Sequence, residues 1–159
     1  MSVQPEVTHL GVGVYWQDLR VGQVFRTLRR TVTEADLVGC INATGMLEEM
    51  FIDADFDAGA MPGRVVPGAL TYCLIEGFIL QTMIQRTGLA LLEVHQKMLE
   101  PVYVGDTVYA DIEVTAVKPT STKGRAVVTS QVRVFNGKGA EVMSYDVKRL
   151  LSGRPGAAQ

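Results

Sequence analysis

Two adjacent carboxylates, Glu48 and Glu49, lie in a segment without regular periodicity, flanked by Leu47, Met50 and Phe51. An apolar pocket raises the pKa of a carboxyl group, which can then act as an acid or a base near neutral pH. The alternative is that both glutamates are solvated charges on a loop. We take the pair as candidate catalytic residues, and we expect no metal and no cofactor.

A second stretch that could contribute to a functional site is residues 63–68 (GRVVPG), which precedes a long apolar segment. Pro67 suits the first position of a helix, and Gly68 lets another group approach the backbone closely. The first amides of a helix lack partners within it, and the helix dipole adds partial positive charge there. Such a helix start would bind a carbonyl oxygen. Pro67 and Gly68 are therefore candidate substrate-binding residues.

Two other charged residues belong to the same region. Arg64 can reach a phosphate or a loop carboxylate, and a plain surface role is the alternative. Glu76 lies inside the apolar segment, where an unpaired charge is costly, so we expect it to have a partner or to lie at an interface.

The histidines and cysteines do not suggest a nucleophilic or metal site. We expect His9, near the N-terminus, to be solvated, and His95 to lie on the polar face of a strand. Cys40 and Cys73 fall in apolar helical segments, so we expect small core residues in a reducing compartment. No cluster has the spacing of metal ligands.

The length, net charge and composition of the chain argue against several classes of partner. The chain has 159 residues, a net charge of −2 and a pI of about 5.7, which does not favour nucleic acid as a partner. The N-terminus lacks the pattern of a signal peptide, and no apolar stretch has the length of a membrane span. We expect a cytoplasmic protein that binds no membrane.

The elements that position these residues follow from the hydrophobic pattern. Residues 70–84 are apolar on nearly every face, which predicts a buried helix. Residues 107–116 and 125–135 alternate, which indicates antiparallel strands with one buried face. The sequence also predicts a helix from Thr33 to about Gly45, and strands at 24–32, 91–102 and 142–151. The predicted fold is α+β, an antiparallel sheet wrapped around a long central helix.

The predicted organisation is a loose segment at 1–18, a single domain at 19–151 and a flexible tail at 152–159. A sheet of about five strands leaves an open edge, which proteins usually pair or cover. We therefore expect a homodimer or a higher homo-oligomer, formed through the sheet or over the helix face.

Four segments, taken in order, resemble the MaoC-like dehydratases, the hotdog-fold group that includes R-specific enoyl-CoA hydratases. They are residues 33–37 (TEADL), 44–53 (TGMLEEMFID), 63–68 (GRVVPG) and 100–107 (EPVYVGDT). The last two look like the family's G-R-I-V-H-G and P-V-x-x-G-D-T stretches. The resemblance implies a hotdog fold, and an acyl-CoA or acyl-carrier thioester as substrate or ligand, with the start of the central helix facing the thioester.

The chain departs from the family's catalytic pattern, S-G-D-x-N-P-x-H-x-D. In an ungapped comparison, Met46 stands in the place of the catalytic Asp and Phe51 in the place of the catalytic His, while Pro67 replaces the His of the helix-launching motif. Methionine and phenylalanine cannot hold a proton near neutral pH, so the usual hydration mechanism does not carry over.

Two classes of function therefore remain. The first is an acyl-thioester enzyme: hydratase-like or dehydratase-like by resemblance, or a thioesterase with Glu48 or Glu49 as the base. In this class Arg64 is a candidate contact of CoA. The second is a non-catalytic acyl-CoA-binding or partner subunit, in which Met46 and Phe51 enlarge an apolar slot for the acyl chain.

Overall fold

The structure is a computed structural model that describes residues 10–56, 59, 61, 63–122 and 124–156. The expectation for His9 lies outside these residues. No helix in the described ranges is long and apolar enough to cross a membrane.

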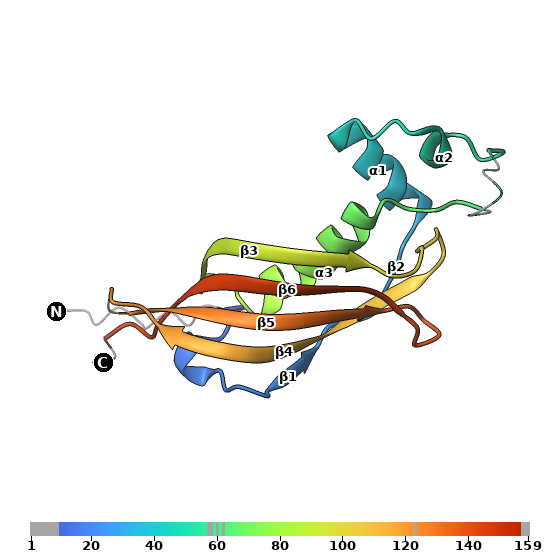
Figure 1. The fold of residues 1–159 in the computed structure, drawn as a ribbon. Coiled ribbons are helices and arrows are strands. Elements are labelled where there is room, and N and C mark those ends of the chain that lie inside the picture. The colour runs from blue at the N-terminus through green and yellow to red at the C-terminus, as the bar shows by residue number, and fades with distance from the viewer. Residues whose placement is uncertain (1–9, 57–58, 60, 62, 123, 157–159) are drawn as a thin grey trace.

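One curved sheet and one long helix make up most of the domain (Figure 1). Helix α3 lies along one face of the sheet, while helices α1 and α2 lie beyond the N-terminal end of α3. The elements in chain order are the 3-10 helix η1 (Trp16–Asp18), β1 (Val24–Arg26), β2 (Arg30–Thr31), α1 (Glu34–Thr44), α2 (Glu49–Ile52), α3 (Gly68–Thr82), β3 (Gly88–Met98), β4 (Thr107–Pro119), β5 (Arg125–Phe135) and β6 (Glu141–Ser152).

The strands are all antiparallel and follow the order β1-β4-β5-β6-β3, with β2 also paired to β4. Strands β4, β5 and β6 are joined as consecutive hairpins, whereas β3 crosses over to pair with the far side of β6. Strand β3 is therefore an edge of the sheet. The predicted α+β arrangement is confirmed.

The alternating pattern of β4 places Val108, Ala110, Ile112 and Val114 in the core, as predicted. A register shift between Val114 and Ala116 then interrupts the alternation. Such an extra residue turns the following side chains to the other face. Val117 packs against the core as a result, and Ala116, which we expected to point inward, is only half-buried.

Two of the predicted strands have different limits. The strand expected at 24–32 is two short strands, β1 and β2, because residues 27–29 leave the ladder. There the Thr27 hydroxyl accepts a hydrogen bond from the amide of Ala110, in place of a main-chain oxygen. Strand β3 ends at Met98, before the predicted bend at Pro101.

Helix α1 begins and ends where the sequence predicts. The Thr33 hydroxyl accepts from the Asp36 amide at 3.2 Å, and the Asp36 carboxylate accepts from the Thr33 amide at 2.9 Å. This reciprocal capping box satisfies two amides that would otherwise lack partners. Gly45 ends the helix with φ +72°, a conformation that glycine adopts at little cost.

Helix α3 begins two residues before the predicted start, and its burial differs from the prediction. Ile75 and Ile79 are fully buried against the sheet, but Cys73 is exposed and Leu80 is 52% exposed. The expectation that every face of this helix is buried, with Cys73 in the core, was wrong for the single chain. The sheet covers one side of the helix and leaves the opposite side open. Cys40 is half-buried against the core.

The expected partner of Glu76 is present. Nη2 of Arg149, on β6, donates to both carboxylate oxygens of Glu76 at 2.5 and 2.6 Å, and the Tyr145 hydroxyl donates at 2.7 Å. Burial, and then the Glu76 carboxylate, raise the pKa of Tyr145 far above its ordinary value, so the hydroxyl stays protonated and donates. These three side chains tie the middle of α3 to the sheet.

Residues ahead of and beyond the 19–151 core also make contacts. The amides of Gly13 and Val14 donate to the carbonyls of Gln85 and Met83 at 2.8 Å, and Trp16 packs against the core. At the other end, Arg154 forms an ion pair with Asp18. These contacts join both ends of the described chain to the C-terminal end of α3 and to η1.

Replacing Arg149 with leucine should lower the free energy of unfolding by about 3 kcal/mol, because the Glu76 charge would be left buried without its partner. The double variant Glu76→Leu, Arg149→Leu should regain much of that loss. Urea denaturation followed by circular dichroism measures both.

The matched control is Lys148→Leu, which removes an exposed ion pair with Glu93 from the same strand. Lys148→Leu should lower the free energy of unfolding much less than Arg149→Leu, since water screens exposed ion pairs. A loss of unfolding free energy for Arg149→Leu that is no larger than for Lys148→Leu would contradict a stabilising role of the Glu76–Arg149 ion pair.

Candidate functional site

A cavity of about 290 Å³ opens at the N-terminal end of α3. Its wall comes from α2, from the segment that leads into α3, from the end of β3 and the turn after it, and from the start of β6. The described residues in the wall are Met50, Phe51, Met61, Val65, Val66, Pro67, Gly68, Thr71, Met98, Leu99, Glu100, Pro101, Val102, Val142 and Met143. The wall is thus mostly apolar, as in typical ligand pockets.

The start of α3 contributes backbone to this cavity. Pro67 is the N-cap residue, and its carbonyl accepts from the amides of Leu70 and Thr71. The amides of Gly68 and Ala69 have no backbone partner among the described residues. A Cβ atom added to Gly68 would lie only 2.9 Å from Sδ of Met98, so glycine permits this close packing. The predicted helix start, with free amides beside a cavity, is present.

Only two of the described wall residues carry polar side chains. Thr71 is 1% exposed, and its hydroxyl has no hydrogen-bond partner among the described residues. Glu100, two residues after the end of β3, is exposed and is the one ionisable side chain among the described wall residues.

The predicted catalytic glutamates lie elsewhere. Glu48 is the N-cap residue of α2 and Glu49 its first residue, and both side chains are exposed. Neither belongs to the cavity wall. The residues of α2 that do line the cavity are the apolar Met50 and Phe51. Met46 is 38% exposed and is likewise not part of the wall.

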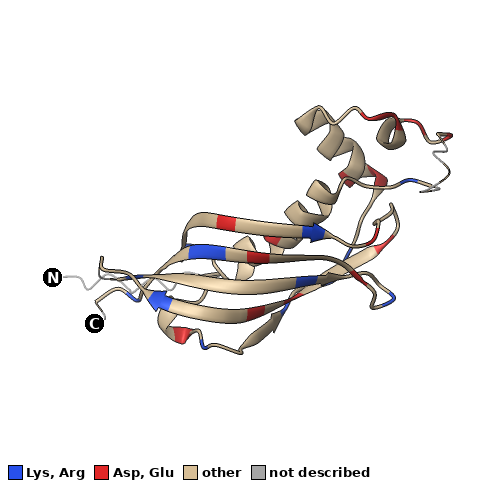
Figure 2. Cartoon of the chain, viewed as in Figure 1, with Lys and Arg blue, Asp and Glu red and all other residues tan. Residues whose placement is uncertain are grey.

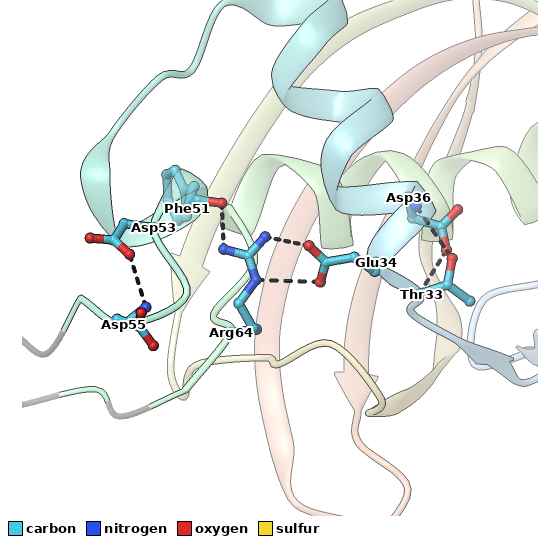
Figure 3. A network of polar contacts seen from close by, with 7 residues as sticks. All are labelled: Thr33, Glu34, Asp36, Phe51, Asp53, Asp55 and Arg64. Atoms are coloured by element: carbon cyan, nitrogen blue, oxygen red, sulfur yellow. Dashed lines mark hydrogen bonds and ion pairs between the residues drawn. The ribbon is translucent and has the colours of Figure 1, made fainter.

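Arg64 fixes the segment that carries Phe51. Its Nη1 donates to the Phe51 carbonyl at 2.8 Å, and its Nε and Nη2 both donate to the Glu34 carboxylate of α1 (Figure 3). Among the described residues, Arg64 is the only cation between α1 and α3, a region otherwise rich in carboxylates (Figure 2). One guanidinium therefore joins α1, α2 and the segment leading into α3, which fixes this loop, while contact of Arg64 with CoA stays a prediction.

Sequence reasoning missed both of the polar residues in the described wall, Thr71 and Glu100. Thr71 lies three residues after Gly68, so it falls on nearly the same face of the helix, and this spacing could have indicated it. Glu100 begins the segment 100–107 that carried the family resemblance, but sequence alone gave no reason to place it beside Gly68.

The other candidates lie outside the cavity. His95 is exposed on the polar face of β3, as predicted, and its Nε2 lies 2.7 Å from a carboxylate oxygen of Glu93. The described residues contain no group of His, Cys, Asp or Glu that could hold a metal ion.

The sequence matches no protein-family model and no curated protein, but its fold matches solved structures closely. An (R)-hydratase of A. caviae involved in PHA biosynthesis is 26% identical, with a TM-score of 0.70 over 87% of this chain and 99% of that one. A MaoC-like dehydratase of Rhodospirillum rubrum is 21% identical, with a TM-score of 0.75 over 90% of this chain and 99% of that one. These matches confirm the predicted resemblance and the hotdog fold.

A third match concerns a longer protein. A conserved protein of Mycobacterium tuberculosis that has a double hotdog fold is 20% identical, with a TM-score of 0.82. The match covers 96% of this chain but only 48% of that one. The present chain therefore corresponds in fold to one half of a double hotdog.

Replacing Glu34 with glutamine should destabilise the protein at neutral pH, and the loss should fade in acid. The hydrogen bond from Arg64 lowers the pKa of Glu34 from its ordinary value of 4.5. A carboxyl group with a lowered folded-state pKa stabilises above its unfolded-state pKa, and this contribution is lost as pH falls through the folded-state pKa. Urea denaturation of both proteins from about pH 7 to about pH 3 measures the difference.

Glu48→Gln is the matched control, because Glu48 is exposed and has no ion pair among the described residues. It should show no such pH-dependent difference. If the destabilisation by Glu34→Gln were the same across the whole pH range, the contact between Arg64 and Glu34 would not stabilise the protein through charge.

Proposed function

We propose that this protein binds an acyl thioester, with the thioester carbonyl at the start of α3 and the acyl chain in the adjoining cavity. The observation that carries the proposal is the position of the cavity: its mostly apolar wall includes Pro67 and Gly68 at the start of α3, where the amides of Gly68 and Ala69 have no backbone partner among the described residues. Amides and a helix dipole attract a carbonyl oxygen, and an apolar wall of this size suits a short hydrocarbon chain.

The family resemblance supports the thioester as the ligand class. The (R)-hydratase and the MaoC-like dehydratase share the hotdog fold, and the residues that lead into α3 resemble the corresponding motif of that group. The carrier of the acyl group, CoA or an acyl carrier protein, would lie outside the cavity. Since six carboxylates lie between Thr33 and Phe56, phosphates of a carrier would be repelled from the α1–α2 side.

On this proposal the protein is a binding or partner subunit. Met46 and Phe51 replace the proton-transfer residues of the resembling family, and the exposed Glu48 and Glu49 stand away from the cavity. Hydration by an Asp-His pair therefore has no counterpart among the described wall residues.

One observation favours a second candidate, a thioester hydrolase or hydratase. Glu100 lies in the cavity wall, where its carboxylate could take a proton from a water molecule near the thioester. In this candidate, Glu100 takes over the role that the sequence suggested for Glu48 or Glu49.

We further propose that a second hotdog domain, most simply another copy of this chain, pairs with β3. Within the described part of the chain this strand pairs only with β6, so its other edge presents main-chain groups without a strand partner. Leu89, Leu91, Leu92 and Met98 on it are each about half exposed. The similarity to one half of a double hotdog supports a partner domain of the same fold.

Isothermal titration calorimetry with butyryl-CoA, and with CoA alone, tests whether the protein binds the acyl group of a thioester. Butyryl-CoA should bind more tightly than CoA, because only the acyl chain enters the cavity. Leu99→Trp should weaken binding of butyryl-CoA by about tenfold, or about 1.4 kcal/mol, by filling the cavity mouth. Val21→Trp is the control, an equally large change at an exposed position that does not line the cavity. Equal affinity for CoA and butyryl-CoA would contradict the proposal.

Assays of crotonyl-CoA hydration and of butyryl-CoA hydrolysis separate the two candidates. We expect no turnover by the purified protein. Turnover that falls at least about a hundredfold in Glu100→Gln but not in Glu48→Gln would instead support the second candidate.

Light scattering coupled to size-exclusion chromatography tests the partner. The wild type should be a dimer, and Leu91→Lys should shift it toward the monomer, because a charge would have to be buried at the paired edge. Leu28→Lys, at an exposed leucine between β1 and β2, on the side of the sheet opposite to the β3 edge, should leave the dimer intact. A dimer unaffected by Leu91→Lys would place the interface elsewhere.

A further inference from the structure

The face of the sheet opposite α3 carries three arginines gathered around two aromatic rings. Tyr109 of β4 and Phe135 of β5 are paired in register, and the centres of their stacked rings lie 5.5 Å apart. The guanidinium carbons of Arg26 and Arg29 lie 5.4 and 5.1 Å from the centre of the Tyr109 ring. That of Arg133 lies 5.8 Å from the centre of the Phe135 ring. All three arginines are exposed, and we call these five residues the arginine patch.

The arginine patch holds more positive charge than its own carboxylate balances. Asp111 lies between Arg26 and Arg133 in the sheet, and it accepts from Nε and Nη2 of Arg26 at 2.6 and 2.8 Å. Among the described residues, Arg133 forms no ion pair, and Arg29 makes a single hydrogen bond, of 3.4 Å, to a main-chain carbonyl. The next outward-facing carboxylate of β4, Glu113, lies two residues further along the strand. Three positive charges therefore stand against one carboxylate that is already bound.

Residues 44–56, which include α2, carry the opposite charge, and we call them the acidic segment. They contain no lysine or arginine. Their four carboxylates are exposed, and none forms an ion pair among the described residues: Glu48, Glu49, Asp53 and Asp55. The apolar side chains of Leu47 and Ile52 beside them are 67% and 53% exposed. The acidic segment therefore presents negative charge around an exposed apolar surface.

The arginine patch and the acidic segment lie on opposite sides of the sheet. The acidic segment is beyond the N-terminal end of α3, on the side of the sheet that the helix covers (Figures 1 and 2). The arginine patch faces the other way, because the residues that alternate with Tyr109 in β4 are in the core. Contact between the two surfaces therefore requires a second copy of the chain.

The two surfaces have complementary chemistry. Arginine and tyrosine are enriched at protein interfaces, and a guanidinium held over an aromatic ring loses less conformational freedom when it binds. Arg26 and Arg133 are on strands either side of β4, which places them about 10 Å apart. The carboxylates of the acidic segment stand at both ends of α2, so they can reach arginines on separate strands. Leu47 and Ile52 can then cover the aromatic rings between these ion pairs.

We propose that the arginine patch binds the acidic segment of a second copy, and so joins dimers formed through β3 into larger assemblies. The contact uses two different surfaces, so it can continue from one dimer to the next. Exposed ion pairs are weak and screened by salt, so the dimer remains the unit in dilute protein at physiological salt. Because α2 lines the cavity, each contact also holds the cavity wall of the copy that is bound. The inference does not depend on the thioester as ligand.

Sedimentation velocity at rising protein concentration tests the contact. In about 10 mM sodium chloride charges act over about 30 Å, and the sedimentation coefficient should rise above that of the dimer; in about 1 M salt they act over about 3 Å, and it should stay at the dimer value. A patch variant, Arg29→Gln with Arg133→Gln, and a segment variant, Glu48→Gln with Glu49→Gln, should each weaken the low-salt association about tenfold or more. An equimolar mixture of the two variants should regain association, because each supplies the surface that the other lacks.

The control variant, Arg20→Gln with Lys118→Gln, removes the same charge at exposed positions outside the arginine patch. It should associate like the wild type. A wild type that stays dimeric at low salt, a patch variant that associates no less than the control, or a mixture no more associated than its components would overturn the inference. If the patch variant fails to fold, as thermal unfolding would show, the segment variant is compared with the control on the same terms.

Discussion

The packing of α3 against one face of the sheet is the contact on which the rest of the structure depends. Ile75 and Ile79 bury the middle of the helix in the core, and the buried carboxylate of Glu76 joins it to Arg149 and Tyr145 of β6. A buried ion pair is stable only with good geometry and satisfied hydrogen bonds. The ion pair therefore favours one position of the helix on the sheet over others that would bury the same apolar area. That position determines where the N-terminal end of the helix lies relative to the strands.

The location of the cavity follows from this placement. Because the helix begins level with the end of β3 and the start of β6, its free amides meet an apolar space rather than a strand. Arg64 holds the segments next to this cavity in place, since its guanidinium donates hydrogen bonds to both the Phe51 carbonyl and the Glu34 carboxylate. The site is thus built from segments that are distant in sequence, and each is held by a different contact.

The chemistry of the site differs from that of the family it resembles. The cavity keeps the features that hold a carbonyl oxygen and a hydrocarbon chain, while methionine and phenylalanine occupy the places of proton-transfer groups. Glu100 and Thr71 are the polar side chains that remain in the described wall. Binding and selection of a ligand are therefore better supported by this arrangement than acid–base catalysis by the chain alone.

The sequence by itself determined the features that depend on neighbouring residues. The capping box of Thr33 and Asp36, the alternation of β5 and of β4 as far as Val114, the apolar helix and its proline-glycine start are local patterns, and the structure contains all of them. Tertiary structure alone decided which side chains face the cavity. Exposure of Glu48 and Glu49 depends on where α2 lies at the end of α3, exposure of Cys73 depends on which side of α3 packs against the sheet, and the partner of Glu76 lies 73 residues away in sequence. Such choices are set by packing between distant segments, on which local periodicity carries no information.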